Sequence, residues 1–302
     1  MVSNRFFPSL PVVNLLYAAT LWGLVWYPLQ ELKKAGIPGL WVTLIAYAAA
    51  LVVTLVFLRR SYVDLWRFKG RLAALALAAG WCNAAFFVAV AEGDPARVVL
   101  LFYLAPVWSI ILGFIFLREQ PDVQSLVIGL LAIIGAMFML WNPKIGMPWP
   151  HTWVDWLSLS SGFAFAVTNV LVRGLSEASQ IAKAQATFVG VALVALVWIL
   201  LTHSPVPMAA GFAWATCIAL GVFGIATMTL AVQYGVSHLP IYQSAVILLF
   251  EVLVTVLSTY LIAQYHLTIW GWIGGLFIVA ASLVSALGTR AANTSAQGTK
   301  NQ

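Results

Sequence analysis

Long apolar segments recur at regular intervals along the whole chain. Runs such as 72–91 and 126–141 are apolar at both odd and even positions, which is typical of helices and unlike the alternation of outer-membrane strands. A helix needs about 20 such residues to cross a bilayer. The pattern predicts an all-α membrane protein with ten spans, at roughly 10–30, 39–58, 72–91, 96–117, 124–142, 153–174, 182–202, 210–234, 240–262 and 268–288.

The two halves of the chain are related to each other. An offset of 146 positions aligns 97–142 with 243–288 without a gap and pairs Gly129 with Gly275. Because five crossings are an odd number, a second five-helix half must be inverted relative to the first, which is a common construction of transporters. We therefore expect two inverted five-helix repeats around a central cavity, at 1–148 and 149–290, and a disordered cytoplasmic tail at 291–302.

Composition supports the membrane assignment and sets the orientation. Apolar residues make up 63% of the 302 residues and charged residues only 8%, whereas soluble domains carry roughly 25% charged residues. A cytoplasmic N-terminus places 11 of the 15 Lys and Arg residues on the inner side, as the positive-inside rule favours. The sequence thus predicts a multi-pass protein of a bacterial inner membrane with both termini in the cytoplasm.

The same charge distribution explains the net charge of +6 without a nucleic-acid partner. Cys82 and Cys217 both fall inside predicted spans, where a thiol behaves as a small hydrophobe. We expect no disulfide, no metal site and no cofactor. The expected partners are the lipid bilayer and a small-molecule substrate, with the protein a monomer or weak dimer.

Glu251 is the only charged residue at the middle of a predicted span. An ionised group at that depth is costly unless it faces a cavity or a partner. Ser244, Thr255 and Ser258 share its helical face. Two interpretations stay open: Glu251 is a proton-accepting or ammonium-binding group, or it is a protonated side chain hydrogen-bonded to a neighbouring helix.

Further candidate residues combine rings, amides and hydroxyls in apolar surroundings. Pro106 is expected to kink the fourth span, since a proline leaves a carbonyl about one turn earlier, near Phe102, without an amide donor. Midspan Lys and Arg are missing, which favours a neutral zwitterion or a lipophilic cation over an anion as substrate. The predicted substrate-binding residues are Trp22, Asn83, Tyr103, Trp108, Phe165, Asn169, Ser244 and Glu251.

A family resemblance lies in the fourth span. The segment L-L-F-Y-L-A-P-V-W-S-I-I-L-G-F-I-F-L-R-E at 100–119, with Pro106 and Glu119 in place, resembles the repeat signature of the EamA group in the drug/metabolite transporter superfamily. In the second half Val252 replaces the usual proline and Gln264-Tyr265 replaces the closing Glu. The resemblance implies ten helices in inverted halves, a central cavity and export of metabolites.

Within that group, the Tyr-Leu-x-Pro element at 103–106 and the aromatic-rich spans most resemble the YddG-type exporters. That likeness implies export of aromatic and other neutral amino acids by alternating access. The alternative is a multidrug or organic-cation exporter of the same superfamily. An intramembrane enzyme is disfavoured because no nucleophile–base pair lies within a span, and a channel is disfavoured because one Glu per chain forms no ring of charge.

Overall fold

All the secondary structure in the described residues is helical. The computed structural model describes residues 9–92, 95–121, 123–140, 150–263 and 269–298. Its α-helices and two π-helical segments, η1 and η2, are α1 Leu10–Leu24, α2 Trp26–Lys34, α3 Gly39–Leu55, α4 Leu58–Arg67, α5 Lys69–Glu92, α6 Pro95–Phe102, α7 Ala105–Leu112, η1 Gly113–Leu117, α8 Val123–Leu140, α9 Trp153–Gly174, α10 Gln180–Leu201, α11 Gly211–Ala219, η2 Leu220–Ile225, α12 Ala226–His238, α13 Ile241–Leu248, α14 Phe250–Ala263 and α15 Ile269–Gly298.

Many of these segments are long and apolar enough to cross a membrane. Six of them in the described residues meet both conditions: Leu10–Lys34, Lys69–Val90, Trp153–Gly174, Gln180–Leu201, Gly211–His238 and Ile241–Ile262. Shorter apolar helices occupy the positions of the other predicted spans, at Gly39–Leu55, Ala105–Leu117, Leu126–Phe138 and Ile269–Ala281. The chain is therefore a multi-pass membrane protein.

The basic segment after the second predicted span was expected to be a loop and is instead helix α4. Its two faces differ: Ser61 is fully buried and donates to Gln185 Oε1 at 2.7 Å, while Tyr62 and Trp66 are exposed. A search for long apolar runs does not detect such a short amphipathic helix. At the other end of the chain, α15 runs to Gly298 and so continues into the segment predicted to be a tail.

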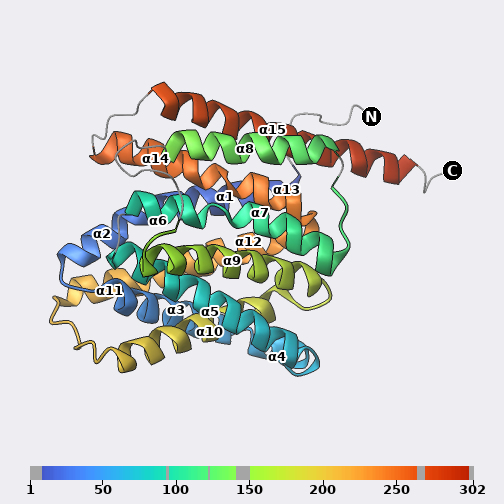
Figure 1. The fold of residues 1–302 in the computed structure, drawn as a ribbon. Helices are drawn as coiled ribbons and strands as arrows, with labels where there is room; N and C mark the ends of the chain where they lie inside the picture. Colours follow the sequence, from blue (N-terminus) through green and yellow to red (C-terminus); the bar gives the residue numbers. More distant parts are fainter. Residues whose placement is uncertain (1–8, 93–94, 122, 141–149, 264–268, 299–302) are drawn as a thin grey trace.

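The helices lie side by side along one common direction (Figure 1). Helices α8 and α15 pack together on one face of the bundle, and α3, α5 and α10 pack together on the opposite face. Helices α1, α9, α12 and α13 lie between these two layers and contact one another in several pairs. The candidate site residues come largely from this middle layer and from the broken helix α6–α7 beside it.

The span Leu10–Lys34 is interrupted at Val25, between α1 and α2, and two further spans are interrupted near their middle. The first of these two breaks separates α6 from α7 at Tyr103 and Leu104, just before Pro106, and the second separates α13 from α14 at Leu249. Tyr103 and Leu249 correspond under the 146-residue offset. The second break forms without a proline, and there the Val252 amide donates to the Leu249 carbonyl three residues back, at 3.0 Å. Backbone irregularity of this kind is tolerated at membrane depth only inside a protein bundle.

Close backbone contacts hold several helix pairs together. A Cβ atom added at Gly190 of α10 would overlap the carbonyl oxygen of Ala76 in α5. A Cβ atom at Gly221 of η2 would overlap the carbonyl oxygen of Ala46 in α3. Small residues permit such approach because they place no bulky side chain between the backbones. Dispersion contacts between the backbones then stabilise the helix pair in lipid. The α5–α10 and α3–η2 contacts therefore depend on glycine.

We predict that Gly190→Ala lowers stability, because the added methyl group must push α5 away from α10. Overpacking of this kind costs about 1–3 kcal/mol. Gly129→Ala is the matched control, since its Cβ would meet only side-chain atoms at ordinary distances of 3.7 Å or more. Thermal unfolding in detergent should show a lower melting temperature for Gly190→Ala and no loss for Gly129→Ala. Equal melting temperatures for the two variants would contradict the assigned contact.

Candidate functional site

Glu251 and Tyr103 meet at the helix breaks α6–α7 and α13–α14. Glu251 lies in the first turn of α14, and Tyr103 lies between α6 and α7. The two side chains are hydrogen-bonded, with the Tyr103 hydroxyl as donor to the Glu251 carboxyl. Tyr103 also packs against the apolar cluster that contains Leu249 and Val252. The breaks thus bring an acid and a phenol from the two halves of the chain together in the interior.

Helix α1 covers the backbone beside Glu251. A Cβ atom added at Gly23 would lie 2.8 Å from the Glu251 carbonyl oxygen, so only glycine fits there. Trp22 is half-buried and packs on the cluster that includes Tyr47 and Phe188.

Farther along α14, the Trp26 indole N–H donates to Ser258 Oγ at 2.8 Å. Ser258 in turn donates to the carbonyl of Thr255 at 2.9 Å. The C-terminal part of the polar stripe predicted for this helix is therefore bonded to Trp26 at the start of α2 and to its own backbone. Glu251 and Ser244 are left as its candidates for ligand contact.

Aromatic rings line the other side of Tyr103. The Phe102 ring lies 4.8 Å from Phe86, 5.7 Å from Tyr103 and 5.5 Å from Phe165, measured between centroids. The carbonyl of Phe102, which Pro106 leaves without its helical donor, faces α9, where a Cβ atom on Gly162 would lie 2.6 Å from that oxygen. Phe165 is thus brought to the Tyr103 side of the site, while the freed carbonyl is packed against glycine.

The remaining predicted residues differ in their bonding. Asn83 accepts from the Tyr47 hydroxyl at 2.8 Å and donates to the Ala79 carbonyl at 2.9 Å, so its amide bonds within the bundle. Asn169 of α9 is only 3% exposed. Trp108 Nε1 and Ser244 Oγ are buried and have no hydrogen-bond partner among the described residues. Buried polar atoms without partners are uncommon and mark places where a ligand or water is expected.

Trp108 and Ser244 lie on helices that touch, α7 and α13. The Trp108 ring also packs edge-on against Phe163 of α9 at 5.6 Å. An indole N–H can only donate, and a hydroxyl can donate or accept. A ligand acceptor group that reaches either atom would satisfy it.

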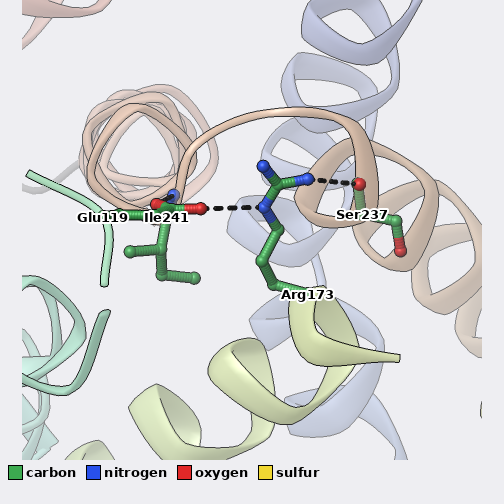
Figure 2. A network of polar contacts seen from close by, with 4 residues as sticks. All are labelled: Glu119, Arg173, Ser237 and Ile241. Carbon is green, nitrogen blue, oxygen red and sulfur yellow. Dashed lines mark hydrogen bonds and ion pairs between the residues drawn. The ribbon is translucent and has the colours of Figure 1, made fainter. Parts of the chain in front are cut away.

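A charged network at one end of the bundle was not identified from the sequence (Figure 2). Arg173 at the end of α9 donates from Nε to Glu119 Oε1 at 2.9 Å and from NH1 to the Ser237 carbonyl at 2.7 Å. The second carboxylate oxygen of Glu119 accepts from the Ile241 amide at 2.6 Å, in the first turn of α13. The network ties the end of the η1 span to α9, α12 and α13.

Lys183 belongs to the same region. It lies inside α10, one turn after the N-cap Ser179, and is 0% exposed. Its ammonium donates to Ser237 Oγ at 2.6 Å. The sequence placed Lys183 and Arg173 near span ends, among the charges of the inner side, and so did not predict a buried cation. The Ser179 cap at the start of a predicted span was the signal that could have placed Lys183 inside the helix.

No group of three or more His, Cys, Asp or Glu residues that could hold a metal occurs in the part of the chain that the structure describes.

We predict that Glu119→Gln destabilises the protein, because the amide keeps the volume but loses charge-assisted bonds to Arg173 and to the α13 amide. Hydrogen bonds to charged groups contribute about 1.5–3 kcal/mol. The side chains of this pair are only 28% and 16% exposed, whereas those of the Arg67–Glu177 pair are 63% and 71% exposed.

Glu177→Gln is the control, since exposed ion pairs are worth at most about 1 kcal/mol. Melting temperatures of both variants in detergent measure the difference. A loss in Glu177→Gln as large as that in Glu119→Gln would contradict the special role of the buried network.

Comparison with known proteins agrees with the membrane architecture. Residues 9–141 match the model of the EamA-like transporter family. An uncharacterized transporter of Archaeoglobus fulgidus is 26% identical over 202 residues, which cover 67% of this chain and 71% of that protein. A protein of known crystal structure superposes with a TM-score of 0.74 at 18% identity, over 94% of this chain and 100% of the other, which shows the fold alone. The first half of this multi-pass membrane protein thus matches the EamA-like transporter family.

Proposed function

We propose that this chain is a secondary transporter of the drug/metabolite transporter superfamily that exports small neutral metabolites, foremost aromatic and other neutral amino acids, by alternating access. Its place is a bacterial inner membrane with both termini cytoplasmic, as a monomer or weak dimer. The observation that carries the proposal is the Glu251–Tyr103 pair held between two broken helices in a chain whose residues 9–141 match a transporter family.

The packing of the helices supports two related five-helix repeats, 1–148 and 149–290, within this proposal. Taken in chain order, the five spans of the first half pair with those of the second: α1 with α9, α3 with α10, α5 with α11–α12, α6–α7 with α13–α14, and α8 with α15. Under that relation, α3 packs on its own counterpart α10, and α8 packs on its counterpart α15. The α5–α10 contact corresponds to the α3–η2 contact, and the α5–α9 contact corresponds to α1–α12. The packing of α9 on α6 and α7 likewise corresponds to that of α1 on α13 and α14. Related contacts in both halves are what an exchange of conformations between inverted repeats requires.

The residues around the pair suit a zwitterion. Glu251 supplies an acceptor for an ammonium group, and the rings of Phe102 and Phe165 supply an apolar wall. The unpartnered Trp108 indole and Ser244 hydroxyl supply donors for a carboxylate. The other proposed contacts are Asn169, which is buried on α9, and Trp22 on α1. Asn83 is the weakest of the predicted residues because Tyr47 already holds its amide oxygen.

The aromatic surroundings of Glu251 also favour a second candidate, export of organic cations. A carboxylate beside Tyr103 and the Phe102 ring offers both an ion pair and cation–π contacts to a cationic ligand. This function needs no group that binds a carboxylate, so the two candidates predict different substrates.

We predict that Glu251→Gln slows transport of labelled Phe or Thr into proteoliposomes by about tenfold or more while the protein stays folded, because the ammonium loses a charged acceptor worth about 1.5–3 kcal/mol. Tyr103→Phe should slow it less, since the carboxylate remains. Initial rates are measured with and without a pH gradient. Glu31→Gln, which removes an exposed pair with Lys34, is the control and should transport as wild type does.

Movement of organic cations without any amino acid would replace the substrate assignment by the second candidate. Unchanged rates and pH dependence in Glu251→Gln would leave Glu251 with a structural role only.

A further inference from the structure

The buried ammonium of Lys183 has no charge to neutralise it. No carboxylate of the described residues lies within ion-pair distance of Lys183, and its side chain is completely buried. One of its three donors goes to Ser237 Oγ. Burial of an unpaired ammonium costs several kcal/mol unless a charged partner is supplied. Lys183 is therefore a buried polar group whose charge the bundle leaves without a partner.

The acidic groups on the neighbouring elements are engaged elsewhere. Asp64 of α4 accepts from the Ser179 amide at 2.9 Å, before α10 begins. Glu177 pairs with the exposed Arg67. Glu119 divides its two oxygens between Arg173 and the Ile241 amide. The C-terminal end of α12, where Ser237 lies, supplies only the partial negative charge of a helix terminus, equivalent to about half an elementary charge.

Ser237 joins the buried Lys183 to the partly buried Arg173. Its carbonyl accepts from Arg173 and its hydroxyl accepts from Lys183, so both positive groups are anchored on one residue. Glu119 supplies a carboxylate to Arg173 and none to Lys183 (Figure 2). The arrangement already accepts a carboxylate from the protein, and two cations with one carboxylate keep a net positive charge.

We propose that Lys183 and Arg173 form a binding site for the carboxylate of the substrate at this end of the bundle. This inference rests on the proposed function and names the part of the substrate that the site binds. In the proposed orientation the site lies at the cytoplasmic end, where an exported substrate enters. When α9 and α13 separate there, Glu119 leaves Arg173 and the substrate carboxylate takes its place between the two cations. Lys183 then selects amino acids over amines at this entry site, before the substrate moves on to the Glu251 site deeper in the bundle.

The first test compares substrates that differ only in the carboxylate. Proteoliposomes are assayed with labelled phenylalanine and with phenethylamine, its decarboxylated analogue, for wild type, Lys183→Gln and Lys183→Arg. Lys183→Gln should raise the KM for phenylalanine about tenfold or more and leave the KM for phenethylamine unchanged. Lys183→Arg should keep most of the phenylalanine affinity. Lys34→Gln, at an exposed position, is the control for the loss of a positive charge.

The second test needs no transport. Sodium phenylacetate carries the carboxylate without the ammonium, so it probes this site independently of Glu251. It should raise the melting temperature of the detergent-purified wild type and of Lys183→Arg, and it should not raise that of Lys183→Gln.

Equal loss of phenylalanine and phenethylamine transport in Lys183→Gln would overturn the proposal, and so would equal stabilisation of wild type and Lys183→Gln by phenylacetate. If the wild type moves neither phenylalanine nor threonine, the proposed function is wrong, whether or not phenethylamine moves. The phenylacetate measurement then decides on the anion site by itself, with a Lys183-dependent shift supporting it and no such shift refuting it.

Discussion

Polar groups inside this bundle must find their partners within the protein, because the hydrocarbon around it offers none. That constraint explains why the helix breaks at Tyr103 and Leu249 lie among packed helices. It also explains why, next to each break, a backbone amide donates to the carbonyl three residues back and not to the one four residues back. It also explains the bonding of the buried hydroxyls, since Ser158 and Ser161 of α9 donate to carbonyls of neighbouring helices. Against this background the few polar atoms without partners are informative.

Three polar features of the interior lie on the elements that the proposed transport cycle would use. Trp108 and Ser244 keep unpartnered polar atoms between α7 and α13. Lys183 keeps an unneutralised charge near the start of the same α13. The Glu251–Tyr103 pair holds an acid and a phenol in apolar surroundings where either could exchange its partner for a ligand. A protein with only a structural role has no need of such groups.

The sequence predicted the helical membrane architecture because apolar length is a strong signal that survives any detail of packing. It also singled out Tyr103 and Glu251, since a proline-associated tyrosine and a midspan acid are unusual in lipid. It did not predict α4, whose amphipathic pattern is short, nor the Glu119–Arg173 network, whose members lie far apart in the chain and near span ends. The sequence did not distinguish a polar side chain that is bonded within the bundle, such as Asn83, from one that is available to a ligand. Only the spatial neighbours of each side chain make that distinction.

The glycine contacts at Gly190 and Gly221 join pairs of helices into rigid units. Where the backbones of α5 and α10, or of α3 and η2, touch without side chains between them, neither helix can slide or rotate without a steric clash. Each of these pairs must move as one solid piece in any cycle. Rearrangement is then confined to the surfaces where side chains, rather than backbones, separate the helices.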